Sequence, residues 1–414
     1  MTTAFIKPNT KAVQYGRVAG LSAIEPPVWL TLFSQTEPDS RVIDMEAEDL
    51  DPAGLLARLA PMGISRAVIL ATGSHPSAHV QQADAAQALK TFLGAALAIP
   101  VEVFDRLPFD PLATGTIDWD RLSVEKYRAH NWHAWGRNDH AYGATFASVS
   151  CPFGCDFCCV KDFYHSGYRQ RDPALVAMDV RALAGRGITN IKMMDELFAV
   201  DNPGVHAVCD ALAATGLGER LNIWAYARID TVNPVLLAKL RAAGVRWLAY
   251  GIESGDERVR SAAVKGKFSN ARVREVVAMT RDAGIHVLGN FMFGFWDDDR
   301  SSMEATLSLA GDLMCEYVNF YCVTVYPGSK LYADMKARGV DLPVSGEEYA
   351  QMSPRFKPVP TAHLSGEDVL RFRDAAFGRY FNDARYLAMM ERVFGAGTAA
   401  AIRAMCAIDI RSRR

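Results

Sequence analysis

The stretch Cys151-Pro152-Phe153-Gly154-Cys155-Asp156-Phe157-Cys158 places three cysteines in one short loop, separated by three and then two residues. Thiolates are soft ligands that select iron–sulfur clusters, zinc or copper(I). A cubane 4Fe-4S cluster has four irons to satisfy, so three cysteines leave one iron open to a small molecule. The spacing therefore favours a cluster that binds a substrate or cosubstrate at its open iron.

This Cys-x3-Cys-x2-Cys pattern, with Phe157 before the last cysteine, resembles the signature of the radical S-adenosylmethionine (SAM) superfamily. The resemblance implies that Cys151, Cys155 and Cys158 ligate a 4Fe-4S cluster whose open iron chelates SAM. It also implies reductive cleavage of SAM to a 5′-deoxyadenosyl radical, with electrons from a donor such as flavodoxin or ferredoxin.

A structural zinc site is the alternative interpretation of the cysteines, and it would make the protein a zinc-stabilised binding module without turnover. Zinc usually takes four ligands arranged as two separated pairs. No second Cys-x2-Cys occurs, and Cys159 is expected to be a small buried thiol. The remaining cysteines stand singly: Cys209, Cys315, Cys322 and Cys406. The sequence therefore favours a cluster over zinc.

Length and composition narrow the class of protein. A chain of 414 residues predicts about two or three domains. The net charge of −2 gives no sign of bulk nucleic-acid binding. No signal peptide is evident, and the longest apolar run, Phe92 to Phe104, is interrupted by Pro100, which predicts no membrane span. Because the cysteines indicate a reducing compartment, a cytoplasmic location is expected.

Residues 1–115 are predicted to form a small α/β domain. Strand-like runs at 41–44 and 67–71 alternate with helical patterns at 51–59 and 78–92, which implies a parallel sheet with ligands at the strands' carboxyl ends. The segment resembles the Rossmann-like cobalamin-binding domain of one radical SAM branch, through Pro26-Pro27, residues 42–47 and the loop at 72–74. It is shorter than a full domain and lacks Asp-x-His-x-x-Gly, so cobalamin binding stays open and His75 is expected to be a loop residue.

Residues 116–143 are predicted to be a linker that packs over the next domain. Its run Arg128-Ala129-His130-Asn131-Trp132-His133-Ala134-Trp135 combines large apolar bodies with polar tips. Packing between domains is the favoured interpretation, and a position against a cluster or a cobalamin face is the alternative.

Residues 144–335 are predicted to form a partial (β/α)6 barrel. Six strand-like runs recur, and each of the first five precedes a helical pattern, as parallel neighbours with right-handed crossovers require. The runs are residues 144–149, 189–194, 221–226, 246–252, 286–293 and 317–325. Functional side chains are expected at the carboxyl ends of these strands.

Two predicted SAM contacts follow the second and third of these strands. Glu196 stands where the resemblance implies a contact to the SAM amino group, and a carboxylate accepts charge-assisted hydrogen bonds from an ammonium. Arg228 stands where the resemblance implies a contact to the SAM carboxylate, and a salt bridge to Asp230 is the alternative.

Further predicted contacts follow the fourth and fifth strands. Glu253 and Ser254 resemble the family's ribose-contacting segment, since both side chains can hydrogen-bond a hydroxyl. Met292 and Gly294 fall in a segment whose backbone contacts adenine in the family. Lys265 is expected to be a solvated charge.

Residues 336–414 are predicted to be a helical extension, with helices over 366–381, over 384–394 and after Gly395. These helices resemble the carboxyl-terminal helices of cobalamin-type radical SAM proteins. They would either cover the barrel mouth or pack on the barrel.

Together, the resemblance implies an α/β radical SAM enzyme that carries out cobalamin-dependent methylation of an unactivated centre. The substrate would be a small molecule, a lipid or a peptide. The alternative within enzymes is a cobalamin-free rearrangement, epimerisation or hydrogen abstraction that follows the same radical formation.

Overall fold

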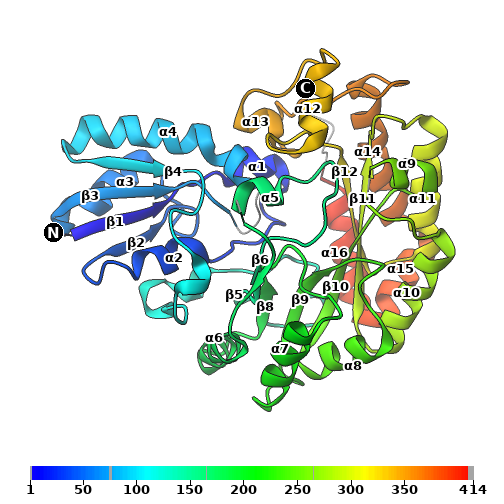
Figure 1. The fold of residues 1–414 in the computed structure, drawn as a ribbon, viewed down its shortest axis with the longest axis horizontal. Coiled ribbons are helices and arrows are strands. Elements are labelled where there is room, and N and C mark those ends of the chain that lie inside the picture. The colour runs from blue at the N-terminus through cyan, green and yellow to red at the C-terminus, as the bar shows by residue number, and fades with distance from the viewer. Residues whose placement is uncertain (1, 74–76, 165, 264, 409–414) are drawn as a thin grey trace.

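Two parallel sheets organise the chain, a four-stranded sheet near the amino terminus and a six-stranded sheet that follows it (Figure 1). The computed structural model describes residues 2–73, 77–164, 166–263 and 265–408. His75 lies outside the described residues.

The amino-terminal sheet has the strand order β2-β1-β3-β4, and all its pairs are parallel. Its strands are β1 (Thr2–Lys7), β2 (Arg41–Asp44), β3 (Ile64–Leu70) and β4 (Val101–Phe104). The predicted strands at 41–44 and 67–71 are confirmed as β2 and β3, whereas β1 and β4 were not predicted. The strand order reverses between β1 and β3, and ligands of open parallel sheets bind at such a reversal.

Four helices accompany this sheet: α1 (Lys11–Tyr15), α2 (Val28–Ser34), α3 (Pro52–Leu59) and α4 (Ala78–Leu97). α3 begins where Asp51 accepts a hydrogen bond from the Gly54 amide and proline fills the first helical position. The helices predicted at 51–59 and 78–92 are confirmed, although α4 continues to Leu97.

The second sheet has the order β12-β11-β10-β9-β8-β5 with parallel pairing throughout, which confirms the predicted set of six strands. The strands are β5 (Tyr142–Thr145), β8 (Asn190–Met193), β9 (Asn222–Ala227), β10 (Val245–Glu253), β11 (His286–Phe293) and β12 (Tyr317–Cys322). The first predicted strand ends early: after Thr145 the chain forms β6 (Ser148–Val149), which pairs antiparallel with β7 (Arg169–Gln170).

Helices that follow the barrel strands cover the outer face of the sheet (Figure 1). They are α6 (Pro173–Gly185), α7 (Pro203–Ala213), α8 (Pro234–Ala242), α10 (Asn270–Asp282) and α11 (Arg300–Leu313). Two shorter helices are α5 (Val160–Tyr164), which lies near α1 between the two units, and α9 (Glu257–Ala262), which precedes α10 (Figure 1). Three of the longer helices begin with a capping side chain followed by proline, at Asp172, Asn202 and Asn233. Short 3-10 turns occur at Gly16–Val18, Ala60–Met62, Pro111–Ala113, Trp119–Arg121 and Val124–Lys126.

Trp132 packs among aromatic rings that project from the inner face of the barrel. Its ring lies 5.5 Å from that of Trp224 and 5.2 Å from that of Trp247, both edge-to-face, and stacks 5.7 Å from that of Tyr317. Phe394 stacks on the other side of Trp247, at 5.7 Å. The same run contacts the amino-terminal unit, because His130 accepts from the Ala23 amide at 3.2 Å and Arg128 donates to the Ser22 carbonyl at 2.9 Å, so it packs between the two units as predicted.

The carboxyl-terminal extension packs on the barrel. Its helices are α12 (Lys330–Ala337), α13 (Gly346–Tyr349), α14 (Gly366–Phe381), α15 (Ala384–Phe394) and α16 (Ala396–Cys406), so the helices predicted at 366–381 and 384–394 are confirmed. α14 lies against β11 and β12, where Phe372 meets Phe293 at 5.0 Å and Phe377 meets Phe320 at 5.6 Å. In the described ranges no helix is long and apolar enough to cross a membrane.

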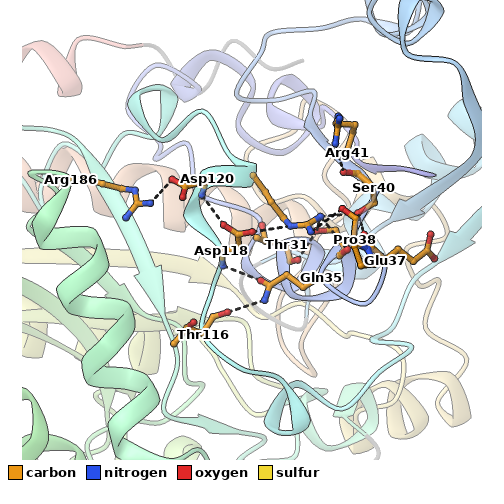
Figure 2. A network of polar contacts seen from close by, with 12 residues as sticks. Thr31, Gln35, Glu37, Pro38, Ser40, Arg41, Thr116, Asp118, Asp120 and Arg186 are labelled. Atoms are coloured by element: carbon orange, nitrogen blue, oxygen red, sulfur yellow. Dashed lines mark hydrogen bonds and ion pairs between the residues drawn. The ribbon is translucent and has the colours of Figure 1, made fainter. Parts of the chain in front are cut away.

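Polar contacts of the linker join the amino-terminal unit to the barrel (Figure 2). The side chain of Gln35, just after α2, accepts from the Asp118 amide at 3.0 Å and donates to the Thr116 carbonyl at 3.0 Å. Arg186, just after α6, reaches Asp120 at 2.5 Å. Trp29 of α2 also packs on Phe146, with ring centroids 4.7 Å apart. The two units therefore share one continuous core.

His133 of the linker is buried against strand β9, and its lowered pKa links the stability of this contact to pH. Its Nε2 lies 2.8 Å from the Asn222 carbonyl oxygen, and the Asn222 amide donates back to the His133 carbonyl at 2.8 Å. Burial lowers the pKa of His133 from 6.5 to about 3. The folded state therefore holds a neutral ring, whereas the unfolded chain gains a proton below pH 6.5. This stabilisation is present above pH 6.5 and is lost as the pH falls toward 3.

We expect His133→Gln to make thermal stability less sensitive to acid between pH 6.5 and 4, by up to about 1.4 kcal/mol per pH unit. Thermal unfolding followed by circular dichroism at several pH values measures this slope. The exposed His363, changed to Gln, is the matched control. An unchanged acid sensitivity in His133→Gln would contradict the assignment.

Candidate active site

The three-cysteine loop follows β6 at the end of the barrel where the parallel strands terminate. The Cys158 amide donates to the Cys155 carbonyl at 3.1 Å, which closes a turn. The Asp156 amide donates to the Ala263 carbonyl at 3.4 Å, and the Asp156 carbonyl accepts from the Leu331 amide at 2.8 Å. Contacts to segments after β10 and β12 therefore fix the loop from both sides.

Asp195 holds the start of this loop. Its carboxylate accepts hydrogen bonds from the Ala147 amide at 2.9 Å and from the Ser148 hydroxyl at 2.5 Å. Asp195 is buried, and burial raises its pKa to about 6. Ser150, with a left-handed φ of 68°, then turns the chain toward the cysteines. The sequence reasoning missed Asp195, although its position beside Glu196 at the end of a strand was the available signal.

The cysteines differ in exposure. Cys151 and Cys155 are half-buried and Cys158 is exposed, while Cys159 is buried, as predicted for a small core thiol. Among the described residues, no group of three or more His, Cys, Asp or Glu is placed to hold a single metal ion. In a cubane cluster each thiolate binds a different iron, and three soft donors in one loop suit that ligand.

Glu196 presents an oxygen without a partner. The Tyr164 hydroxyl donates to its Oε1 at 2.8 Å. Oε2 is fully buried and has no hydrogen-bond partner among the described residues. Burial raises the pKa of Glu196 to about 8. A buried acceptor left open in this way fits an ammonium group, which would stabilise the ionised carboxylate.

Arg228 lies beside the second cysteine. Its Nη1 is 3.4 Å from the Cys155 sulfur, and its Nε and Nη2 each donate to the Asp230 carboxylate at 2.8 Å. The guanidinium also stacks on the Phe153 ring, 3.8 Å from the centroid. The salt bridge to Asp230 that the sequence left open as an alternative is present, and the predicted contact to a SAM carboxylate stays a prediction.

Glu253 is paired with Lys265. The Lys265 ammonium lies 2.9 Å from Glu253 Oε1, and both residues are buried. Lys265 is therefore not a solvated charge, since its ammonium lies beside Gly251 of β10 and is paired with Glu253. Glu253 has a left-handed φ of 64°, which is rare for a residue with a side chain and costs on the order of 1–3 kcal/mol. Such strain concentrates at functional sites.

Ser254 turns into the fold. Its hydroxyl lies 3.2 Å from that of Thr306 on α11 and accepts from the Asp256 amide at 3.1 Å. Ser254 is fully buried. In this conformation its side chain supports the turn that carries Glu253.

Met292 and Gly294 lie at the end of β11, next to the cysteine loop. Met292 belongs to an apolar cluster with Phe157 and Phe295. Asp298 accepts from the Gly294 amide at 2.9 Å and from the Phe295 amide at 3.0 Å, and it is buried. Asp298 was not predicted as a site residue, yet it fixes the backbone that was predicted to contact adenine.

A small crevice lies between the carboxyl ends of β1 and β3 and the barrel, where its lining includes Lys7, Tyr15 of α1, Thr72 and Met194. Lys192 of β8 reaches across to Glu25 at 3.0 Å, and the Glu25 carbonyl accepts from Lys7 at 3.2 Å. Thr72 Oγ1 and Gln82 Oε1 are buried there without a partner among the described residues. The cavity that remains is about 40 Å³.

The volume of this crevice can be compared with the volumes of pockets that bind small molecules. Pockets for drug-sized ligands enclose about 300–1,000 Å³, and a corrin ring is larger than most such ligands. The crevice carries open polar groups at the reversal of the strand order, which is where an α/β sheet binds ligands. The volume of about 40 Å³ between the described residues is below this range, and residues 14, 15, 23 and 25 are among those that line it.

Residues 146–310 match the family model of the radical SAM superfamily. An uncharacterized methyltransferase of Pyrococcus horikoshii is 25% identical over 264 residues, which cover 64% of this chain and 54% of that protein. The chain spans about half or less of the length of the first curated relatives that it matches.

Two solved structures share the fold across both units. The radical SAM methyltransferase TsrM of Kitasatospora setae, with cobalamin and a 4Fe-4S cluster bound, superposes with a TM-score of 0.68 at 14% identity, covering 93% of this chain and 90% of that one. The cobalamin-dependent radical enzyme OxsB, with aqua-cobalamin and SAM bound, gives a TM-score of 0.64 at 10% identity, covering 97% and 70%. The likeness establishes a two-unit fold with a partial barrel.

The two hydrogen bonds that Asp195 accepts from Ala147 and Ser148, called the Asp195 clamp below, can be tested without measuring catalysis. Asp195→Ala leaves two buried donors without an acceptor, at a cost of about 1–3 kcal/mol each. We expect the loop to lose its order and the iron content after anaerobic reconstitution to fall by at least half. Asp341→Ala removes a carboxylate that is 89% exposed and serves as the control. Full iron and sulfide content in Asp195→Ala would contradict the role of this clamp.

Proposed function

We propose that this chain is a radical SAM enzyme, because residues 146–310 match that family model, and that it cleaves SAM reductively at a 4Fe-4S cluster held by Cys151, Cys155 and Cys158. One observation carries the proposal: the three-cysteine loop lies at the carboxyl end of the barrel beside Glu196, whose buried Oε2 has no partner among the described residues. When bound, the cluster and SAM supply a 5′-deoxyadenosyl radical.

In this proposal the residues around the loop bind and orient SAM. Glu196 accepts hydrogen bonds from the ammonium, and Glu253 lies near enough to Lys265 to present an ordered carboxylate toward a ribose hydroxyl. The backbone from Met292 to Gly294, fixed by Asp298, would face the adenine. Ser254 supports this arrangement through Thr306.

In this proposal, aromatic side chains around the cysteine loop would limit the access of water to the radical. Phe157 of the loop packs edge-to-face on Phe295 with ring centroids 5.7 Å apart, and Phe153 covers the guanidinium of Arg228. An apolar surround of this kind suppresses side reactions of a radical. Electrons would come from a donor such as flavodoxin or ferredoxin, which agrees with the cytoplasmic location that we propose.

We propose methyl transfer to an unactivated centre of a small-molecule, lipid or peptide substrate as the reaction that follows. Two findings support it: the relative from Pyrococcus horikoshii is named a methyltransferase, and TsrM, which shares the fold, is described as a methyltransferase with cobalamin bound. The alternative is a cobalamin-free rearrangement, epimerisation or hydrogen abstraction.

The cluster and Glu196 can be tested by SAM cleavage. We expect Cys151→Ala, Cys155→Ala and Cys158→Ala each to abolish formation of 5′-deoxyadenosine by the reconstituted, dithionite-reduced protein. Glu196→Gln should keep the cluster but weaken SAM binding about tenfold or more, since an amide loses the charge-assisted bond. Cys406→Ala, on the distant α16, should resemble the wild type. Deoxyadenosine production by Cys151→Ala, or bound zinc without cleavage, would refute the proposal.

Cobalamin binding can be tested through the closed crevice. If the segment 9–25 must leave for cobalamin to enter, hydroxocobalamin should raise deuterium uptake in that segment. Glu25→Gln weakens the contact to Lys192 and should tighten apparent cobalamin binding several-fold, because it lowers the population of the closed state. Glu37→Gln, which breaks a pair with Arg66 elsewhere on the sheet, is the control. No retained cobalt in either protein would favour the cobalamin-free alternative.

A further inference from the structure

Arg228 is placed by four hydrogen bonds, only one of which points at the cysteine loop. Two go to the carboxylate of Asp230, one from Nη2 goes to the Lys265 carbonyl, and one from Nη1 goes to the Cys155 sulfur at 3.4 Å. A guanidinium has five N–H donors. Its position is therefore fixed by protein groups on three sides before any ligand binds.

The surroundings of Arg228 strengthen its effect on the sulfur. The guanidinium is buried, and the Phe153 ring covers one face at 3.8 Å. Charges act more strongly where water is excluded. Lys265 is also near Cys155, but its charge is neutralised by the buried carboxylate of Glu253 at 2.9 Å. The partner of Arg228 is Asp230, whose side chain is 36% exposed. Arg228 is the cation that contacts the sulfur directly.

We propose that Arg228 is a positioning residue that raises the reduction potential of the cluster through its hydrogen bond to Cys155. The inference rests on the proposed function, because it needs Cys155 to be a cluster ligand. Hydrogen bonds to the ligating sulfurs and local net charge set the potential of iron–sulfur clusters. The role deepens the proposed chemistry, since a less negative potential lets a weaker donor deliver the electron.

The redox step is a one-electron reduction of the bound cluster in which no atom is transferred. In the test the electron comes from dithionite through mediator dyes. Reduction adds one negative charge next to Cys155, so a nearby cation stabilises the reduced state and a nearby carboxylate destabilises it. Arg228 and Asp230 therefore act in opposite directions, although they belong to the same salt bridge.

Because Arg228 and Asp230 are expected to have opposite effects on the reduced cluster, variants of both can distinguish an electrostatic role of Arg228 from a purely structural one. The experiment is an anaerobic redox titration of reconstituted protein without SAM, read by the electron paramagnetic resonance signal of the reduced cluster. We expect Arg228→Gln to lower the ratio of reduced to oxidised cluster at a fixed potential about tenfold, which is about 59 mV for a one-electron couple. Asp230→Asn should raise the ratio, and Arg228→Lys should show less than half of the Arg228→Gln shift.

Arg258→Gln is the matched control, because this arginine is also at the strand ends but is 60% exposed. A purely structural salt bridge would shift Arg228→Gln and Asp230→Asn in the same direction, and that result would overturn the inference. So would a ratio in Arg228→Gln within twofold of the wild type. If Arg228→Gln fails to hold iron, Asp230→Asn, which keeps the guanidinium, carries the test. A wild-type protein that forms no cluster would refute the proposed function itself.

Discussion

The site depends on one buried carboxylate at the point where the first barrel strand breaks. Asp195, at the end of β8, accepts from the Ala147 amide and the Ser148 hydroxyl, and so ties the start of the cysteine loop to the neighbouring strand. A buried acceptor with two donors is costly to disturb, because each donor would be left unsatisfied. The next residue is Glu196, so the same strand end orders the loop and presents the open oxygen beside it.

Two ion pairs lie near Cys155 at the carboxyl end of the barrel and balance the charge there. Arg228 with Asp230, and Lys265 with Glu253, are both partly or fully removed from water. Pairing lets the fold hold two cations near the cysteine loop without leaving an uncompensated charge. Within the first of these pairs, the cation contacts the Cys155 sulfur while the carboxylate of Asp230 binds other nitrogens of the same guanidinium.

The amino-terminal unit is built for ligand binding but is closed. Its strand order reverses between β1 and β3, and Thr72 and Gln82 present polar atoms without described partners at that edge. The segment 9–25 and the contact between Glu25 and Lys192 fill the space. The remaining cavity of about 40 Å³ lies at the place where the strand order of the sheet reverses.

The sequence by itself determined the three-cysteine loop, the parallel barrel and most of its strand boundaries, because cysteine spacing and hydrophobic periodicity are local signals. β11 (His286–Phe293) and α14 (Gly366–Phe381) occur where the pattern predicted them. Only the tertiary structure decided the partners of Arg228, the pairing of Lys265 with Glu253, the clamp at Asp195 and the closure of the crevice. These depend on contacts between segments far apart in the chain, and side-chain identity fixes no long-range partner until the strands are placed side by side.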